Sequence, residues 1–137
     1  MIIHWSQSRF KAAQADPYFD LATIATFCCF SPAHEEAFFS AYLGRQALTK
    51  EKTRLYLMKQ VVLINYALIA LRKLPGSIAV PESPNTPTCM ELLRAFRDGA
   101  LSPAQRRIFA ASLLKQVLTD AASQKFNDAI GVLGDGR

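Results

Sequence analysis

Residues 16–22 read DPYFDLA, and this stretch opens the first helix of a chain whose start signals are helical throughout. Asp16 is typical of an N-cap, and Pro17 suits the first helical position because its missing N–H would have no partner there. Apolar residues then recur at intervals of three and four, which predicts a helix over 17–30 with one buried face. The residues predicted to face inward are Leu21, Ile24, Ala25, Cys28 and Cys29.

Two further helices are predicted before residue 75. A serine–proline pair at 31–32 repeats the first start signal, and Gly44 supplies the stop. Thr49 opens a long helix that continues to about Leu74, where a Pro-Gly pair ends it. Its length makes it the expected central helix of the domain. The residues predicted to face inward on it are Leu55, Met58, Val62, Asn65, Tyr66 and Ile69.

Two capping boxes begin the helices of the C-terminal part. Thr88 with a glutamate three residues later predicts a helix that ends near Gly99. Ser102 with a glutamine three residues later predicts a final, unbroken helix to about Leu133. The inner face predicted for this last helix is Ile108, Ala111, Leu114, Leu118, Ala121 and Ala122.

These elements make an all-α fold of about five helices. We expect an extended N-terminal segment at 1–15, a single helical domain at 16–133 and a disordered tail at 134–137. A surface loop is predicted at about 75–87 within the domain, from Pro81, Pro84 and Pro87 and their polar neighbours. Residues 2–5, IIHW, could form a strand, but no second strand is predicted with which it would pair.

The composition argues against several classes of protein. Half of the 137 residues are hydrophobic, which excludes a wholly disordered chain. The net charge of +5 is modest and is spread at helical spacing, so we expect no nucleic-acid partner. The longest apolar run, 61–71, is shorter than the roughly 20 residues of a spanning helix, so we expect no membrane insertion.

The cysteines and the N-terminus favour a cytoplasmic protein. Cys28, Cys29 and Cys89 are an odd set without metal-type spacing, and we expect reduced core thiols. No secretory signal is visible in the first residues. His34 is expected on the surface, and a histidine-based metal site is not expected.

Four segments, taken in order, resemble the aminoglycoside phosphotransferase and choline kinase family. In that family an apolar strand ending in Ile-Asp-Trp precedes a helix that opens with Asp-Pro-x-x-Asp-Leu-Ala. An aromatic-rich helix and a long apolar helix follow. Here the matching segments are 2–5, 16–22, 35–44 and 50–74. The resemblance implies the helical C-terminal lobe of a kinase-like phosphotransferase.

The same resemblance implies that this chain lacks catalytic residues. His4 stands where the family has a metal-binding aspartate, and imidazole is a poor ligand for magnesium. The family's His-x-Asp loop and phosphate-covering loop do not occur in the sequence. We therefore expect a non-catalytic domain, either a remnant or half of a split protein. We expect no cofactor, and Mg-ATP only if a complementary N-lobe is supplied.

The remaining candidate residues have structural or substrate-side roles. Asp16, Pro17 and Asp20 form the structural motif, and Asp20 is expected to meet a donor such as Arg9 or to face solvent. Tyr66 is a candidate for binding a cationic substrate on the face of its ring. The favoured alternative is that Tyr66 packs in the core.

Two alternative functions stay open. One is self-association or binding of a complementary lobe through the N-terminal helices at 1–30, which a missing lobe would leave with exposed apolar surface. The other is a small-molecule pocket lined by Tyr18, Tyr66 and nearby aromatic residues.

Overall fold

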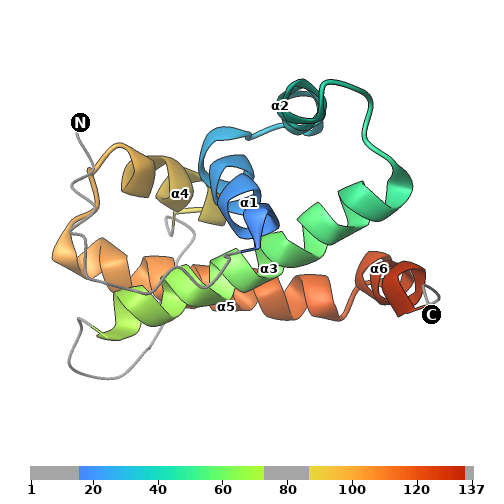
Figure 1. The fold of residues 1–137 in the computed structure, drawn as a ribbon. Coiled ribbons are helices and arrows are strands. Elements are labelled where there is room, and N and C mark those ends of the chain that lie inside the picture. The colour runs from blue at the N-terminus through green and yellow to red at the C-terminus, as the bar shows by residue number, and fades with distance from the viewer. Residues whose placement is uncertain (1–15, 73–86, 135–137) are drawn as a thin grey trace, which may run out of the picture.

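The computed structural model describes residues 16–72 and 87–134, and within them the fold is six α-helices without a strand (Figure 1). The all-α prediction is confirmed. The segment predicted at 1–15, most of the 75–87 loop, and the residues His4 and Arg9 lie outside the described part. Of the tail predicted at 134–137, residues 135–137 lie outside it, and Gly134 is the last residue of a helix. The helices are α1 (Pro17–Cys28), α2 (Pro32–Leu43), α3 (Thr49–Arg72), α4 (Cys89–Arg97), α5 (Pro103–Ala121) and α6 (Gln124–Gly134).

Helix α3 is the centre of the molecule, as its length predicts. It packs against α1, α5 and α6, and α5 runs beside it in the opposite direction (Figure 1). Helix α4 packs on α1 and α5. Helix α2 stands at the margin beyond α1 and joins α3 through a short loop (Figure 1).

The start of α1 is fixed as its sequence predicts. The carboxylate of Asp16 accepts a hydrogen bond from the backbone N–H of Tyr18 at 3.0 Å. Its second oxygen accepts from Arg54 of α3 at 2.6 Å, and that guanidinium also lies 4.4 Å from the centroid of the Tyr18 ring. Asp16 therefore caps α1 and ties it to α3. Asp20 is exposed, which agrees with the second of the two predictions for it, a donor such as Arg9 or contact with solvent.

The buried face of α1 differs from its prediction. Leu21 and Ala25 are buried, but Ile24 is 45% exposed and Cys28 is exposed. Most residues of α1 are apolar, so spacing alone does not select one face. Phe27 selects it, because its ring packs 4.7 Å from the ring of Tyr66 on α3. The buried residues of this helix are Leu21, Ala22, Ala25, Thr26 and Phe27.

Four aromatic rings hold α1, α3, α4 and α5 together. Phe96 of α4 lies 5.2 Å from Phe27 and 5.6 Å from Tyr66, measured between ring centroids. It also stacks on Phe109 of α5 at 5.0 Å. The favoured prediction for Tyr66, a tyrosine packed against the core, is thereby confirmed.

The last helix is not continuous, and this corrects the sequence prediction. It breaks after Ala121, and Ser123 starts α6 anew. The Ser123 hydroxyl accepts a hydrogen bond from the N–H of Phe126 at 3.2 Å and donates to the carbonyl of Asp120 at 2.5 Å. These bonds satisfy backbone groups at the break, so the chain turns and α6 packs on α3.

The inner face predicted for α5 is also wrong in part. Ala111 is buried as predicted, but Leu118 is 72% exposed. Phe109 and Leu113, which the pattern omits, are 1% and 0% exposed. Stacking of Phe109 on Phe96 fixes the rotation of α5 about its own axis.

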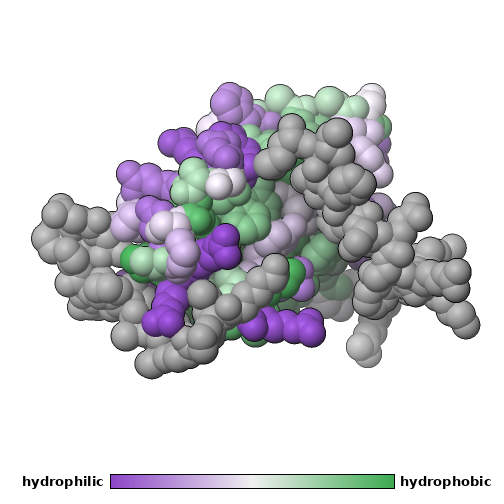
Figure 2. Space-filling view, turned by 90° about the vertical axis from the view of Figure 1, so that its left-hand side faces the viewer, coloured by the Kyte–Doolittle hydropathy of each residue, from purple (hydrophilic) through white to green (hydrophobic). Residues whose placement is uncertain are grey.

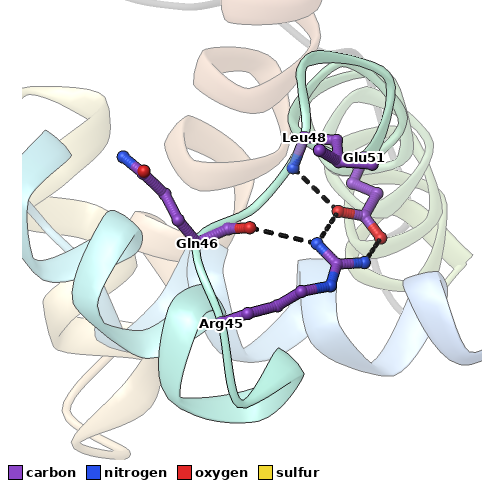
Figure 3. Close-up of polar contacts among 4 residues, drawn as sticks. All are labelled: Arg45, Gln46, Leu48 and Glu51. Atoms are coloured by element: carbon purple, nitrogen blue, oxygen red, sulfur yellow. Dashed lines mark hydrogen bonds and ion pairs between the residues drawn. The ribbon is translucent and has the colours of Figure 1, made fainter.

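A cluster of polar contacts closes the loop between α2 and α3 (Figure 3). Gly44 ends α2 with φ of 68°, the left-handed conformation that favours glycine. The Arg45 guanidinium donates to the two carboxylate oxygens of Glu51 at 2.7 and 2.9 Å and to the carbonyl of Gln46 at 3.0 Å. The backbone N–H of Leu48 donates to Glu51 at 2.8 Å, which caps the start of α3.

The end of the molecule formed by α4 and the start of α5 has a mixed surface. In the view that faces it, hydrophobic residues lie between hydrophilic ones over the described part (Figure 2). Two arginines of α4, Arg94 and Arg97, lie 4.9 and 5.3 Å from the centroid of the Phe30 ring. They hold the junction of α1 and α2 by cation–π contact.

Candidate functional site

A cleft of about 630 Å³ opens between α2 and the body of the domain, and every helix contributes to its wall. Pockets that hold small organic ligands have volumes of about 300–1,000 Å³. Most of the wall is apolar. Its larger apolar and aromatic side chains are Phe30, Phe39, Leu55, Tyr56, Leu63 and Leu93.

Two ion pairs join α2 to α3 along one side of this cleft. Glu35 pairs with Lys59. Lys52 Nζ lies 2.9 Å from Glu36 Oε1, although the two groups are not aligned as a hydrogen bond. All four side chains are partly exposed, at 25–43%, so each pair contributes little to the free energy of folding. Their main effect is to hold α2 in place.

A hydrogen-bonded network links α3 and α5 in the lining of the cleft. Gln60 of α3 is 6% exposed, and its Nε2 donates to Asp120 Oδ2 of α5 at 3.0 Å. The other oxygen of Asp120 accepts from Gln116 Nε2 at 2.9 Å. Asp120 therefore receives a donor on each oxygen and anchors α5 to α3.

Three oxygens of the cleft lining are buried without a hydrogen-bond partner. They are Thr26 Oγ1, Gln60 Oε1 and Glu36 Oε1. Thr26 and Gln60 are each only 6% exposed, so bulk water does not satisfy them. A buried polar group without a partner costs about 1–3 kcal/mol. Folded proteins keep few such groups, and those beside a cavity are candidates for contact with a ligand.

The two thiols in the cleft lining are poor nucleophiles. Burial raises the pKa of Cys29, and the nearby Glu35 carboxylate raises it further. Burial and then Asp120 raise the pKa of Cys89 to about 11. Both therefore stay protonated at neutral pH. The free Cys28 thiol is exposed, which corrects the prediction of three core thiols.

The predicted substrate-side tyrosines lie apart and do not line the cleft. Tyr18 is at the first turn of α1, with its ring 6.0 Å from that of Phe39 and beneath Arg54. Tyr66 belongs to the aromatic cluster at the other end of α1. Burial is the main cause that raises the pKa of both phenols.

The described residues contain no group of three or more His, Cys, Asp or Glu side chains placed to hold a metal ion. His34 is exposed, as predicted, and its backbone N–H donates to the Ser31 cap at 3.2 Å. The described lining of the cleft offers hydrogen-bonding groups, ion pairs and apolar surface.

The sequence prediction missed the polar residues of the cleft, chiefly Thr26, Gln60 and Asp120. A signal for the first two existed, because each is an uncharged polar residue within an apolar helical stretch. Asp120 could not be recognised in this way, because it lies within a stretch that was predicted to be one unbroken helix.

Comparison of the chain with protein-family models, curated proteins and solved structures finds no match. Among the described helices, α3 alone is long and apolar enough to cross a membrane by length and composition. The core helix of a soluble protein meets the same two criteria.

Proposed function

We propose that this chain is a non-catalytic helical domain that binds a small molecule in the cleft between α2 and α3. The order of sequence motifs supports kinship with the C-terminal lobe of the choline kinase and aminoglycoside phosphotransferase family. The proposal retains that kinship as ancestry and assigns binding, rather than phosphoryl transfer, to the isolated chain.

The state of the reactive groups supports binding over catalysis. Each carboxylate in the cleft already has a polar or charged neighbour: Glu35 has Lys59, Glu36 has Lys52, and Asp120 has two amides. Carboxylates held in such contacts are poorly placed to take a proton from a substrate. The thiols are held in the protonated form, so neither is activated for attack.

The observation that carries the proposal is the unpaired oxygens of Thr26 and Gln60 beside an apolar cleft. An apolar body entering the cleft would be removed from water, and its polar group would find partners that the protein itself does not supply. Both effects favour the bound state.

A two-dimensional NMR titration of the full chain tests the proposal. We expect members of a small-molecule fragment library to shift the signals of Thr26 and of the Gln60 and Gln116 side-chain amides. Calorimetry with Mg-ATP should show no heat of binding. Micromolar affinity for Mg-ATP, or fragments that leave all cleft signals unmoved, would overturn the proposal.

Two tryptophan variants provide the matched control. Met90→Trp places a large ring at the cleft, which Met90 lines, and should abolish the fragment shifts. Leu118→Trp changes an exposed residue of α5 that does not line the cleft, and should leave them intact. Equal loss in both variants would show that the shifts do not report on this site.

A second function, self-association, is favoured by a stripe of exposed apolar residues on α3. Val61, Ile64 and Leu68 are 49%, 38% and 57% exposed. With Leu57 and Leu71 they repeat at alternating intervals of three and four, the spacing of a coiled-coil seam. A second copy of α3 presents the same pattern, so the stripe is self-complementary. Binding of a complementary lobe through the N-terminal helices remains the alternative interface.

A further inference from the structure

We infer that the ligand of the cleft is a neutral amphipathic molecule, with an apolar body and a head group that donates N–H hydrogen bonds as a primary amide does. This inference rests on the proposed function and deepens it by naming the class of ligand. Three features support it. They are the balanced charges of the cleft lining, the kind of polar atom that has no hydrogen-bond partner, and the mobility expected of α2.

The charges of the lining favour a neutral ligand. Lys52, Lys59 and Lys125 are balanced by Glu35, Glu36 and Asp120. Lys125 Nζ also lies 4.4 Å from the centroid of the Tyr56 ring. A cationic or anionic head would have to displace one of these contacts and would leave a charge without its partner in a partly apolar cleft, which is costly.

The unpaired atoms select a donor on the ligand. Glu36 Oε1 already lies 2.9 Å from Lys52 Nζ, so the oxygens without any partner are those of Gln60 and Thr26. Gln60 Oε1 can only accept a hydrogen bond, whereas Thr26 Oγ1 can accept or donate. A ligand head with an N–H group supplies the donor that Gln60 Oε1 lacks. An ester or ether head, which has no donor, would leave the acceptor oxygens as they are.

The orientation of the Gln60 amide follows from its neighbour. Asp120 Oδ2 lies 3.0 Å from one terminal atom of Gln60, and a carboxylate oxygen requires a donor there. That atom is therefore Nε2, and the amide oxygen is the unpaired one. The contact with Asp120 therefore identifies which terminal atom of Gln60 is the acceptor.

Helix α2 provides the route by which a ligand reaches these shielded oxygens. Phe39 is its one buried residue, and Phe38 and Leu43 pack partly buried against the core. Glu35 and Glu36 form partly exposed ion pairs with lysines of α3. A helix with so little buried surface opens at low cost. Its two ends are fixed, by the Phe30 contacts and by the Arg45–Glu51 cluster (Figure 3), so the helix can shift without detaching.

Calorimetry with four ten-carbon probes tests the class of ligand. Decanamide supplies a neutral donor head, methyl decanoate a neutral head without a donor, and decylammonium and decanoate the two charges. Each is used below its micelle-forming concentration with the full chain. We expect decanamide to bind about tenfold more tightly than methyl decanoate, as one well-made hydrogen bond allows. The charged probes should bind more weakly than decanamide.

A pair of threonine variants on one helix locates the head group. Thr26→Val removes the unpaired hydroxyl at constant shape, so it should weaken decanamide binding several-fold. Thr23→Val is the control, because the Thr23 hydroxyl donates to the carbonyl of Phe19 at 2.9 Å and does not line the cleft. Thr26→Val should also melt no lower than the wild type, since it removes an unsatisfied buried group.

The outcomes separate this inference from the proposed function. Equal affinity for decanamide and methyl decanoate, or tightest binding of a charged probe, overturns the donor-head inference while leaving the cleft as a binding site. Failure of all four probes, while fragments still shift the cleft signals, overturns the amphipathic class alone. Failure of probes and fragments together overturns the proposed function as well.

Discussion

At the scale of single residues, Glu51 is a partly exposed acid whose pKa is strongly lowered. Its bidentate contact with Arg45 and the hydrogen bond from the Leu48 N–H lower its pKa from 4.5 to about 2. The ionised carboxylate therefore favours the folded state at pH values above 4.5. This contribution is lost as the pH falls from 4.5 towards 2, where the carboxylate becomes protonated.

We predict that Glu51→Gln lowers stability at neutral pH and that the difference from the wild type shrinks below pH 4.5. Urea denaturation at a series of pH values from 7 to 3 measures this difference in the free energy of unfolding. Arg45→Met removes the largest cause of the shift and should reduce the same pH dependence. A wild-type–variant difference that is constant with pH would contradict the assignment of this role to Glu51.

At the scale of elements, α5 shows why helical spacing can mislead. The predicted stripe includes Leu118 and omits Leu113, yet Leu118 is 72% and Leu113 is 0% exposed. The stacking of Phe109 on Phe96 and the break before Ser123 rotate the helix so that Leu113 meets the core.

Matched alanine variants of these two leucines test that orientation. Leu113→Ala should cost about 2–5 kcal/mol of unfolding free energy, because it leaves a cavity in the core. Leu118→Ala should stay within about 0.5 kcal/mol of the wild type, as exposed substitutions do. Urea unfolding followed by circular dichroism gives both values. Similar losses in the two variants would show that Leu118 is buried in solution, either within the fold or by association.

The helix starts, in contrast, were predictable residue by residue. Thr88 and Ser102 each make both hydrogen bonds of a capping box, with Glu91 and Gln105 as partners. Asp16 and Ser31 cap α1 and α2 in the same local manner. A cap depends on residues within one turn of chain, so its partners are visible in the sequence.

At the scale of the whole molecule, the exposed apolar stripe on α3 is the proposed interface for self-association. We predict self-association at high protein concentration, and that Leu68→Glu abolishes it by placing a charge in the seam. Size-exclusion chromatography with light scattering gives the mass of each species. Leu118→Glu, a change on another exposed leucine, should preserve the associated state. A wild-type chain that remains monomeric would exclude this interface.

The sequence by itself determined the helical class, the caps, the stop at Gly44 and the central place of α3, because these depend on local hydrogen bonds and on length. Tertiary structure decided which face of α1 and α5 is buried, the break at Ser123 and the meeting of Thr26 with Gln60 at one cleft. In helices that are apolar on several sides, spacing does not distinguish the faces. The packing of Phe27, Phe96 and Phe109 does, because each ring fills a single position between helices.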